Sequence, residues 1–71
     1  MVGEDHTRTW FAVVGGMSGY ALDAYPWERR RYQRELGNRI VGEFATQKAA
    51  TEAVIDELRR RRAASAMRRR R

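Results

Sequence analysis

The side chains that could act as nucleophiles, bases or metal ligands are few and scattered along the chain. His6 is the only histidine and there is no cysteine, which excludes a histidine pair or a thiolate site for a metal. Ser18 lies in a glycine-rich segment and Ser65 in an arginine-rich one, and neither has a base at a spacing that would activate it. Three carboxylates could still come together in space: Asp23, Glu28 and Glu43. Without a deep pocket such groups are usually solvated, so we expect no enzyme, no metal and no other cofactor.

Arginine is the residue type that most strongly suggests a function. The net charge of the chain is +6. Residues 59–71 hold eight arginines and no acid, a charge of +8, whereas residues 1–58 hold seven basic and nine acidic residues, a charge of −2. Within that acidic part, residues 28–39 are locally basic, with a net charge of +3. Two arginine-rich segments therefore need an explanation.

An anionic partner would explain both segments, because arginines crowded together repel one another unless something offsets their charge. We expect this partner to be nucleic acid; an acidic membrane surface or an acidic protein groove are the alternatives. The C-terminal segment also has two plainer interpretations, a solvated disordered end or a polar extension of the last helix, since its alanines and Met67 favour helix.

The predicted contacts combine arginines, which would bind phosphates, with two aromatic rings that would stack on bases or sugars. The predicted contact residues are Tyr25, Trp27, Arg29, Arg30, Arg31, Arg34, Arg59, Arg60, Arg61, Arg62, Arg68, Arg69, Arg70 and Arg71. Other aromatic residues, Trp10, Tyr20 and Tyr32, would be further candidates for stacking. For Trp10 and Tyr20 we favour a place in the core.

The clearest structural signal is a short strand followed by an amphipathic helix within residues 39–58. The branched residues at its start favour a strand. Strand alternation then places Ile40 and Phe44 on one face, and Val41 and Glu43 on the other.

The helix that follows begins at a threonine and carries one apolar stripe. Thr46 can accept a hydrogen bond from the first helical turn, and Ala50, Val54 and Leu58 recur at four-residue steps. Two acid-before-base pairs would support the helix: Asp56 with Arg60, and Glu57 with Arg61. We expect it to reach at least Arg62.

The N-terminal half predicts a hairpin and then a helix. Residues 8–14 are apolar on both faces, which favours a strand covered on both sides; glycines at residues 15–19 predict a turn, and residues 20–25 alternate as a second strand. Pro26 and the glycine after Leu36 are typical of the two ends of a helix. The alternative for residues 26–36 is an arginine-rich loop.

These elements predict an α+β domain, a three-stranded antiparallel sheet packed against a C-terminal helix, with or without a second helix between strands two and three. We expect a flexible N-terminus at residues 1–7, a single domain at 8–62 and an arginine-rich tail at 63–71. So small a core is marginal, so a homodimer or a protein partner would add to its stability.

Composition bears on the origin and location of the chain. There is no signal peptide and no apolar run long enough for a membrane span, which predicts a cytoplasmic protein. Fourteen of the fifteen basic residues are arginine, and alanine is abundant, as is typical of a GC-rich genome such as that of an actinobacterium or its phage.

The segments WFAVVGG, GY, WERRRYQ and NRIVGEFATQKAATEAV resemble the hybrid-binding module at the N-terminus of eukaryotic ribonucleases H, which is similar to a caulimovirus domain. The resemblance covers about residues 10–54 and implies a hairpin, a helix, a third strand and a second helix. It also implies that Trp27 contacts the DNA strand of a hybrid. The family's basic residues before the closing Phe are here Val41, Gly42 and Glu43. The closing strand and helix are also similar to arm-type DNA-binding domains of tyrosine integrases.

The sequence therefore predicts a small, non-catalytic nucleic-acid-binding protein, of DNA or RNA, with no small-molecule substrate. The alternative is a protein-interaction module, for example a phage-type modulator that docks on a host protein through an apolar face of its sheet. Salt separates the two, because phosphate contacts weaken steeply with it and apolar docking hardly responds.

Overall fold

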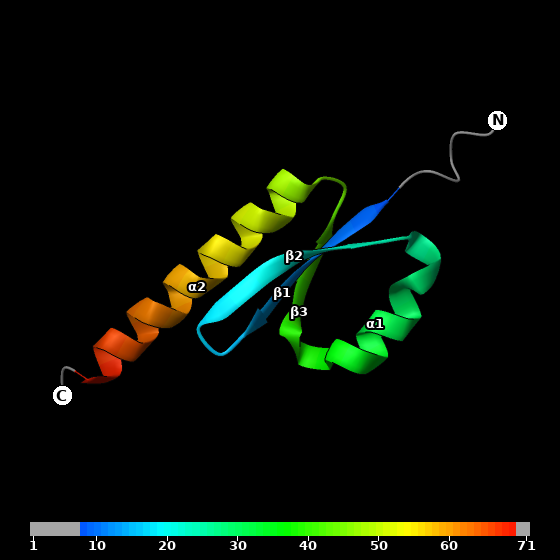
Figure 1. Ribbon diagram of the computed structural model, residues 1–71. Helices are drawn as coiled ribbons and strands as arrows, with labels where there is room; N and C mark the ends of the chain where they lie inside the picture. The colour runs from blue at the N-terminus through cyan, green and yellow to red at the C-terminus, as the bar shows by residue number, and fades with distance from the viewer. Residues whose placement is uncertain (1–7, 70–71) are drawn as a thin grey trace.

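The computed structural model describes residues 8–69, which form a three-stranded sheet between two helices (Figure 1). The elements in order are β1 (Thr9–Gly15), β2 (Ser18–Ala24), a 3-10 turn (Pro26–Glu28), α1 (Arg29–Leu36), a second 3-10 turn (Gly37–Arg39), β3 (Ile40–Phe44) and α2 (Gln47–Arg69). The strands are antiparallel in the order β2-β1-β3. The predicted α+β architecture is confirmed, and the segment between β2 and β3 is helix.

β1 is the central strand, and helices cover both of its faces. Ala12 and Val14 pack with residues of α2, whereas Phe11 and Val13 pack with residues of α1. None of these four side chains exposes more than 2% of its surface. The apolar character of both faces of this strand thus follows from its central position, as the sequence predicts.

Two glycines shape the β1–β2 hairpin. Gly16 has a φ of 64°, as a type II′ turn requires at its first central position, and the turn is only two residues long. Gly19 lies in β2, where α2 crosses the sheet closely. A Cβ atom there would lie 2.8 Å from Cγ1 of Val54 and 2.6 Å from the carbonyl oxygen of Val13, so no larger residue fits without a shift.

β3 contains a bulge, and this overturns the predicted orientation of its side chains. The pairing with β1 shifts by one residue after Ala12, so Val41 is an extra residue in β3. Ile40 consequently packs on the α1 side of the sheet and Phe44 on the α2 side, rather than both on one face. The ring of Phe44 covers Gly42, where a Cβ atom would lie 2.7 Å from it.

α2 begins and packs as the sequence predicts. The hydroxyl of Thr46 accepts a hydrogen bond of 3.1 Å from the N–H of Ala49. Ala50 and Val54 are buried against the sheet and Leu58 packs at the edge of the same cluster. Beyond Leu58 the helix continues without a break to Arg69, because the alanines in that stretch favour helix and no glycine or proline interrupts it.

Several sequence predictions concern residues outside the described range. The N-terminus at residues 1–7, Arg70 and Arg71 lie outside it, and so do the side chains of Arg68 and Arg69. Between residues 8 and 69, no helix has the length and apolar character needed to cross a membrane.

Candidate nucleic-acid interface

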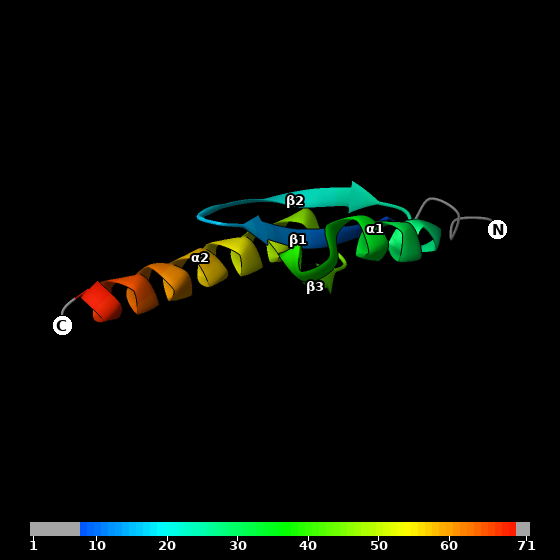
Figure 2. The ribbon, with the colours of Figure 1, turned by 90° about the horizontal axis from the view of Figure 1, so that it is seen from below.

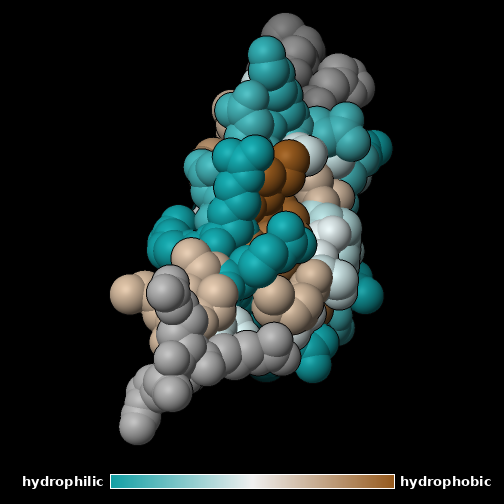
Figure 3. All heavy atoms as spheres, turned by 90° about the vertical axis from the view of Figure 1, so that its left-hand side faces the viewer, coloured by the Kyte–Doolittle hydropathy of each residue, from teal (hydrophilic) through white to brown (hydrophobic). Residues whose placement is uncertain are grey.

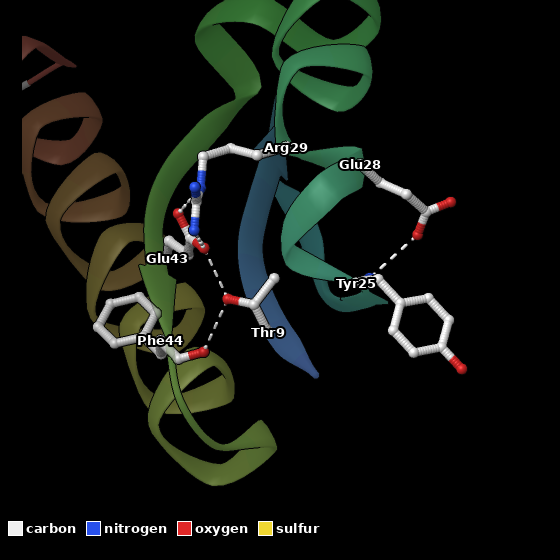
Figure 4. Close-up of polar contacts among 6 residues, drawn as sticks. All are labelled: Thr9, Tyr25, Glu28, Arg29, Glu43 and Phe44. Carbon is white, nitrogen blue, oxygen red and sulfur yellow. Dashed lines mark hydrogen bonds and ion pairs between the residues drawn. The ribbon is translucent and has the colours of Figure 1, made fainter. Parts of the chain in front are cut away.

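The turn between β2 and α1 holds two predicted contact residues, Tyr25 and Trp27, in a fixed arrangement. The backbone N–H of Glu28 donates to the carbonyl oxygen of Tyr25 over 2.9 Å. In return, the Glu28 carboxylate accepts a hydrogen bond of 3.0 Å from the N–H of Tyr25 (Figure 4). Pro26 suits the first position of this turn because its φ is fixed and it has no N–H to leave unpaired.

Tyr25 and Trp27 stack on each other, and Arg8 joins them. The two rings are nearly parallel, at an angle of 6° with their centres 5.7 Å apart. The Arg8 guanidinium lies 4.5 Å from the centre of the Tyr25 ring. It donates to the Tyr25 hydroxyl over 3.1 Å and pairs with Asp23, and these contacts raise the pKa of Arg8. We call Arg8, Tyr25 and Trp27 the Trp27 platform; its outermost ring, Trp27, is 77% exposed.

Arg29 is engaged within the fold. Its Nε and Nη2 atoms donate to the two oxygens of Glu43, both over 2.8 Å (Figure 4). Glu43 also accepts a hydrogen bond of 2.8 Å from the hydroxyl of Thr9. The hydrogen bond from Arg29 is the main reason why the pKa of Glu43 is lowered. This network ties the start of α1 to β3 and β1, so Arg29 is an anchor of the fold.

The other three arginines of α1 divide into one paired residue and two without an acidic partner. Arg31 lies 3.8 Å from Glu28 and 3.4 Å from Glu35. For Arg30 and Arg34, no carboxylate lies within 4.0 Å in the described part of the chain.

Arg30 and Arg34 are exposed and follow the exposed Trp27 of the preceding turn at steps of three and four residues. A shallow depression lies beside the indole, lined by Pro26, Trp27, Arg29, Arg30 and Gln33. The exposed ring of Trp27 and Arg30 therefore line one depression, and Arg34 follows Arg30 one helical turn further along α1.

The arginines at the start of the C-terminal segment also divide. Arg61 donates to Glu57 over 2.9 Å and to the carbonyl oxygen of Gly16 over 2.9 Å, which fastens α2 to the hairpin turn. Arg60 pairs with Glu57 at 3.4 Å and not with the predicted Asp56.

Arg59 and Arg62 are exposed, and neither has a carboxylate within 4.0 Å among residues 8–69. The two arginine-rich segments are not brought together, because α1 and α2 lie on opposite faces of the sheet (Figure 1). α2 runs past the tip of the hairpin, and hydrophilic side chains cover most of the surface on this side, with only a narrow hydrophobic strip between them (Figure 3).

The remaining aromatic residues are placed differently from one another. Tyr32 packs against Phe11, with ring centres 6.1 Å apart, and Trp10 packs at the edge of the α2-side core. Tyr20 is 52% exposed, so the expectation that it plugs the core is wrong. The sequence interpretation missed Arg8; the signal for it is the hairpin register, which places Thr9 opposite Ala24 and hence Arg8 beside Tyr25.

The three carboxylates considered as chemical groups all have partners within the fold: Asp23 binds Arg8, Glu28 binds the backbone of Tyr25, and Glu43 binds Arg29. In the described range, no group of three or more histidines, cysteines or acids has an arrangement that could hold a metal ion.

No protein-family model, curated protein or solved structure matches this chain.

Proposed function

We propose that this protein binds nucleic acid and catalyses no reaction. The Trp27 platform would stack on a base or a sugar, and arginines on both helices would contact phosphates. The observation that carries the proposal is the 77% exposed Trp27, stacked on Tyr25 and beside Arg30, which has no acidic partner in the described part of the chain.

Stacking is the interaction for which this geometry is best suited. Large apolar rings are usually buried, so an exposed one at a surface often marks a binding site. The ring of Trp27 is already oriented before a ligand binds, because Tyr25 and the turn hold it. A ring fixed in advance loses little conformational entropy on binding. Every base has a π-face, so such a platform tolerates any sequence.

The phosphate contacts proposed here are a subset of those predicted from the sequence. Arg30 lines the depression beside the platform, Arg34 lies one turn further along α1, and Arg59 and Arg62 lie on α2. Their guanidinium groups have no acidic partner to displace in the described structure. Arg29, Arg31 and Arg61 have such partners, so we assign them mainly to the fold.

A protein-interaction module remains the competing class, but the surface proposed for it is not accessible. The apolar side chains of β1 that would form a docking face are buried under α1 and α2. A protein partner would therefore have to use another surface.

The test is the affinity of Trp27→Ala for single-stranded and duplex oligonucleotides. Stacking on aromatic residues contributes about 1–3 kcal/mol per base, so we expect a loss of roughly 5- to 150-fold. The melting temperature should not change, since the ring is exposed. Trp27→Phe keeps a π-face and should recover part of the affinity. If Trp27→Ala binds like the parent, the platform is not the site.

A matched pair of arginine variants tests the phosphate contacts. One double variant combines Arg30→Gln with Arg34→Gln, and the other combines Arg29→Gln with Arg31→Gln. Both remove the same charge from the same helix. We expect the first double variant to bind more weakly with an unchanged melting temperature, and the second to melt earlier. Equal losses of affinity in the two variants would indicate that only the total charge matters.

A further inference from the structure

The two edges of the sheet differ in how they are protected against pairing with another strand. β3 is only five residues long and contains the bulge at Val41. These features discourage strand addition. β2 is seven residues long and pairs with β1 without any irregularity. It contains no lysine or proline, and its one charge, Asp23, is bound by Arg8.

Within residues 8–69, no element covers the outer edge of β2. α1 and α2 lie to either side of the sheet, and no described element lies beyond β2 (Figure 2). In a two-residue hairpin the pair that flanks the turn is hydrogen-bonded, so Ser18 bonds to β1. Since bonding alternates along an antiparallel strand, the N–H and C=O groups of Gly19, Ala21 and Asp23 point outward without a strand partner.

We propose that this edge pairs with β2 of a second copy of the chain, in an antiparallel arrangement with a two-fold axis at Ala21. The two sheets would then join into one of six strands. The outward backbone groups meet their counterparts in this register, with Ala21 opposite Ala21 of the second copy and Gly19 opposite Asp23 of the second copy. A two-fold contact needs such a self-complementary surface.

The side chains fit the same register. Tyr20 and Leu22 both lie on the α1 side of β2, because their partners Val13 and Phe11 belong to the α1-side core. Pairing about Ala21 places Tyr20 opposite Leu22 of the second copy. The Tyr20 ring, 52% exposed in one copy, would pack against that leucine. The edge carries no net charge that would repel an identical edge, since Asp23 is neutralised by Arg8.

The contact is small, so the dimer should be weak. One strand from each copy buries less than the roughly 1,200–2,000 Å² of a stable interface. We therefore expect dissociation in the micromolar to millimolar range, visible as a rise in mean mass with protein concentration. The dimer is independent of nucleic acid, so failure of the proposed function would leave this inference standing.

Sedimentation equilibrium over a hundredfold range of concentration tests the pairing. Tyr20→Lys puts a charge opposite an apolar residue of the second copy and should keep the protein monomeric at concentrations where the parent dimerises. Val41→Lys is the matched control, because it places the same charge at a 39% exposed position on the other edge strand. It should dimerise like the parent.

Ala21→Pro is a second, backbone test. The N–H of Ala21 points away from β1, so proline removes no bond of the existing sheet but blocks the central pair of the new one. This variant should stay monomeric, and its circular dichroism spectrum should match that of the parent. If it unfolds, the test rests on Tyr20→Lys alone. Three results would overturn the proposal. The parent could stay monomeric at every concentration, Tyr20→Lys could dimerise like the parent, or Val41→Lys could lose dimerisation as much as Tyr20→Lys does.

Discussion

The two arginine-bearing helices are attached to the sheet in different ways. α2 is held by apolar side chains, with Ala50 and Val54 buried against β1. α1 has no fully buried residue; partly buried Tyr32 and Leu36 pack on the sheet, and the ion pair between Arg29 and Glu43 ties down its start. Arginine side chains hold both helices in part, through Arg29 on α1 and Arg61 on α2, but only α2 also buries apolar side chains completely.

This difference shows why a count of arginines does not measure a binding surface. In α1 half of the predicted contacts, Arg29 and Arg31, have carboxylate partners inside the fold. On α2 the paired arginines are Arg60 and Arg61, and both use Glu57. No acid follows Glu57 in the sequence, so the arginines after Arg61 have no acid near them along the chain. The net positive charge of the sequence therefore increases toward its C-terminal end.

Breaking the apolar attachment of α2 should have the largest effect. Val54→Asp places an unpaired carboxylate between helix and sheet, and we expect it to destabilise the domain by more than about 4 kcal/mol, enough to unfold it. Ile55→Asp is the matched control, one residue along the helix and 43% exposed in the parent, and should still melt cooperatively. Thermal unfolding followed by circular dichroism separates the two. Similar melting of Val54→Asp and the parent would refute the packing of α2.

The next largest effect should come from removing the unopposed charge of the C-terminal segment. Truncation after Arg62 removes four arginines and keeps Leu58, the last apolar residue in the core cluster. If all four neutralise phosphates on duplex DNA, the slope of log affinity against log salt becomes shallower by roughly 3 to 4 units.

The fold should survive this truncation, which melting would confirm. A truncated protein that binds DNA and RNA with the slope of the parent would show that the segment only adds solubility. A truncated protein that fails to fold would show that the end of α2 packs on something that stabilises it.

Local patterns predicted the parts of the fold that depend on near neighbours. The threonine cap at Thr46, the apolar stripe through Val54, the helix after Pro26 and the covered central strand each follow from spacing or composition within one element. The helical nature of the C-terminal segment was one of two open interpretations, since propensity favoured helix and repulsion between arginines opposed it.

Contacts between distant segments could not be predicted in this way. The bulge at Val41 depends on how β3 pairs with β1, and it moves Ile40 and Phe44 to opposite faces. The same limit applies to charges, because Glu43 follows Arg29 by 14 residues and no helical spacing connects them. The candidate site was therefore predicted by residue type at Trp27, while the division of the arginines into paired and available ones needed the structure.

The smallest expected effect concerns the ion pair at the start of α1 and appears as a dependence of stability on pH. The pKa of Glu43 in the folded protein is below 4.5, the ordinary value for a glutamate, because Arg29 donates to its carboxylate. Its contribution to stability is therefore fully present above pH 4.5 and is lost as the pH falls through the lower, folded pKa. Glu43→Gln should melt a few degrees earlier at neutral pH, and its melting temperature should fall less than that of the parent on acidification. Glu52→Gln, on the exposed side of α2, should keep the acid dependence of the parent. If Glu43→Gln loses stability below pH 4.5 as steeply as the parent, the pair with Arg29 does not anchor α1, and Arg29 becomes available to phosphate together with Arg30 and Arg34.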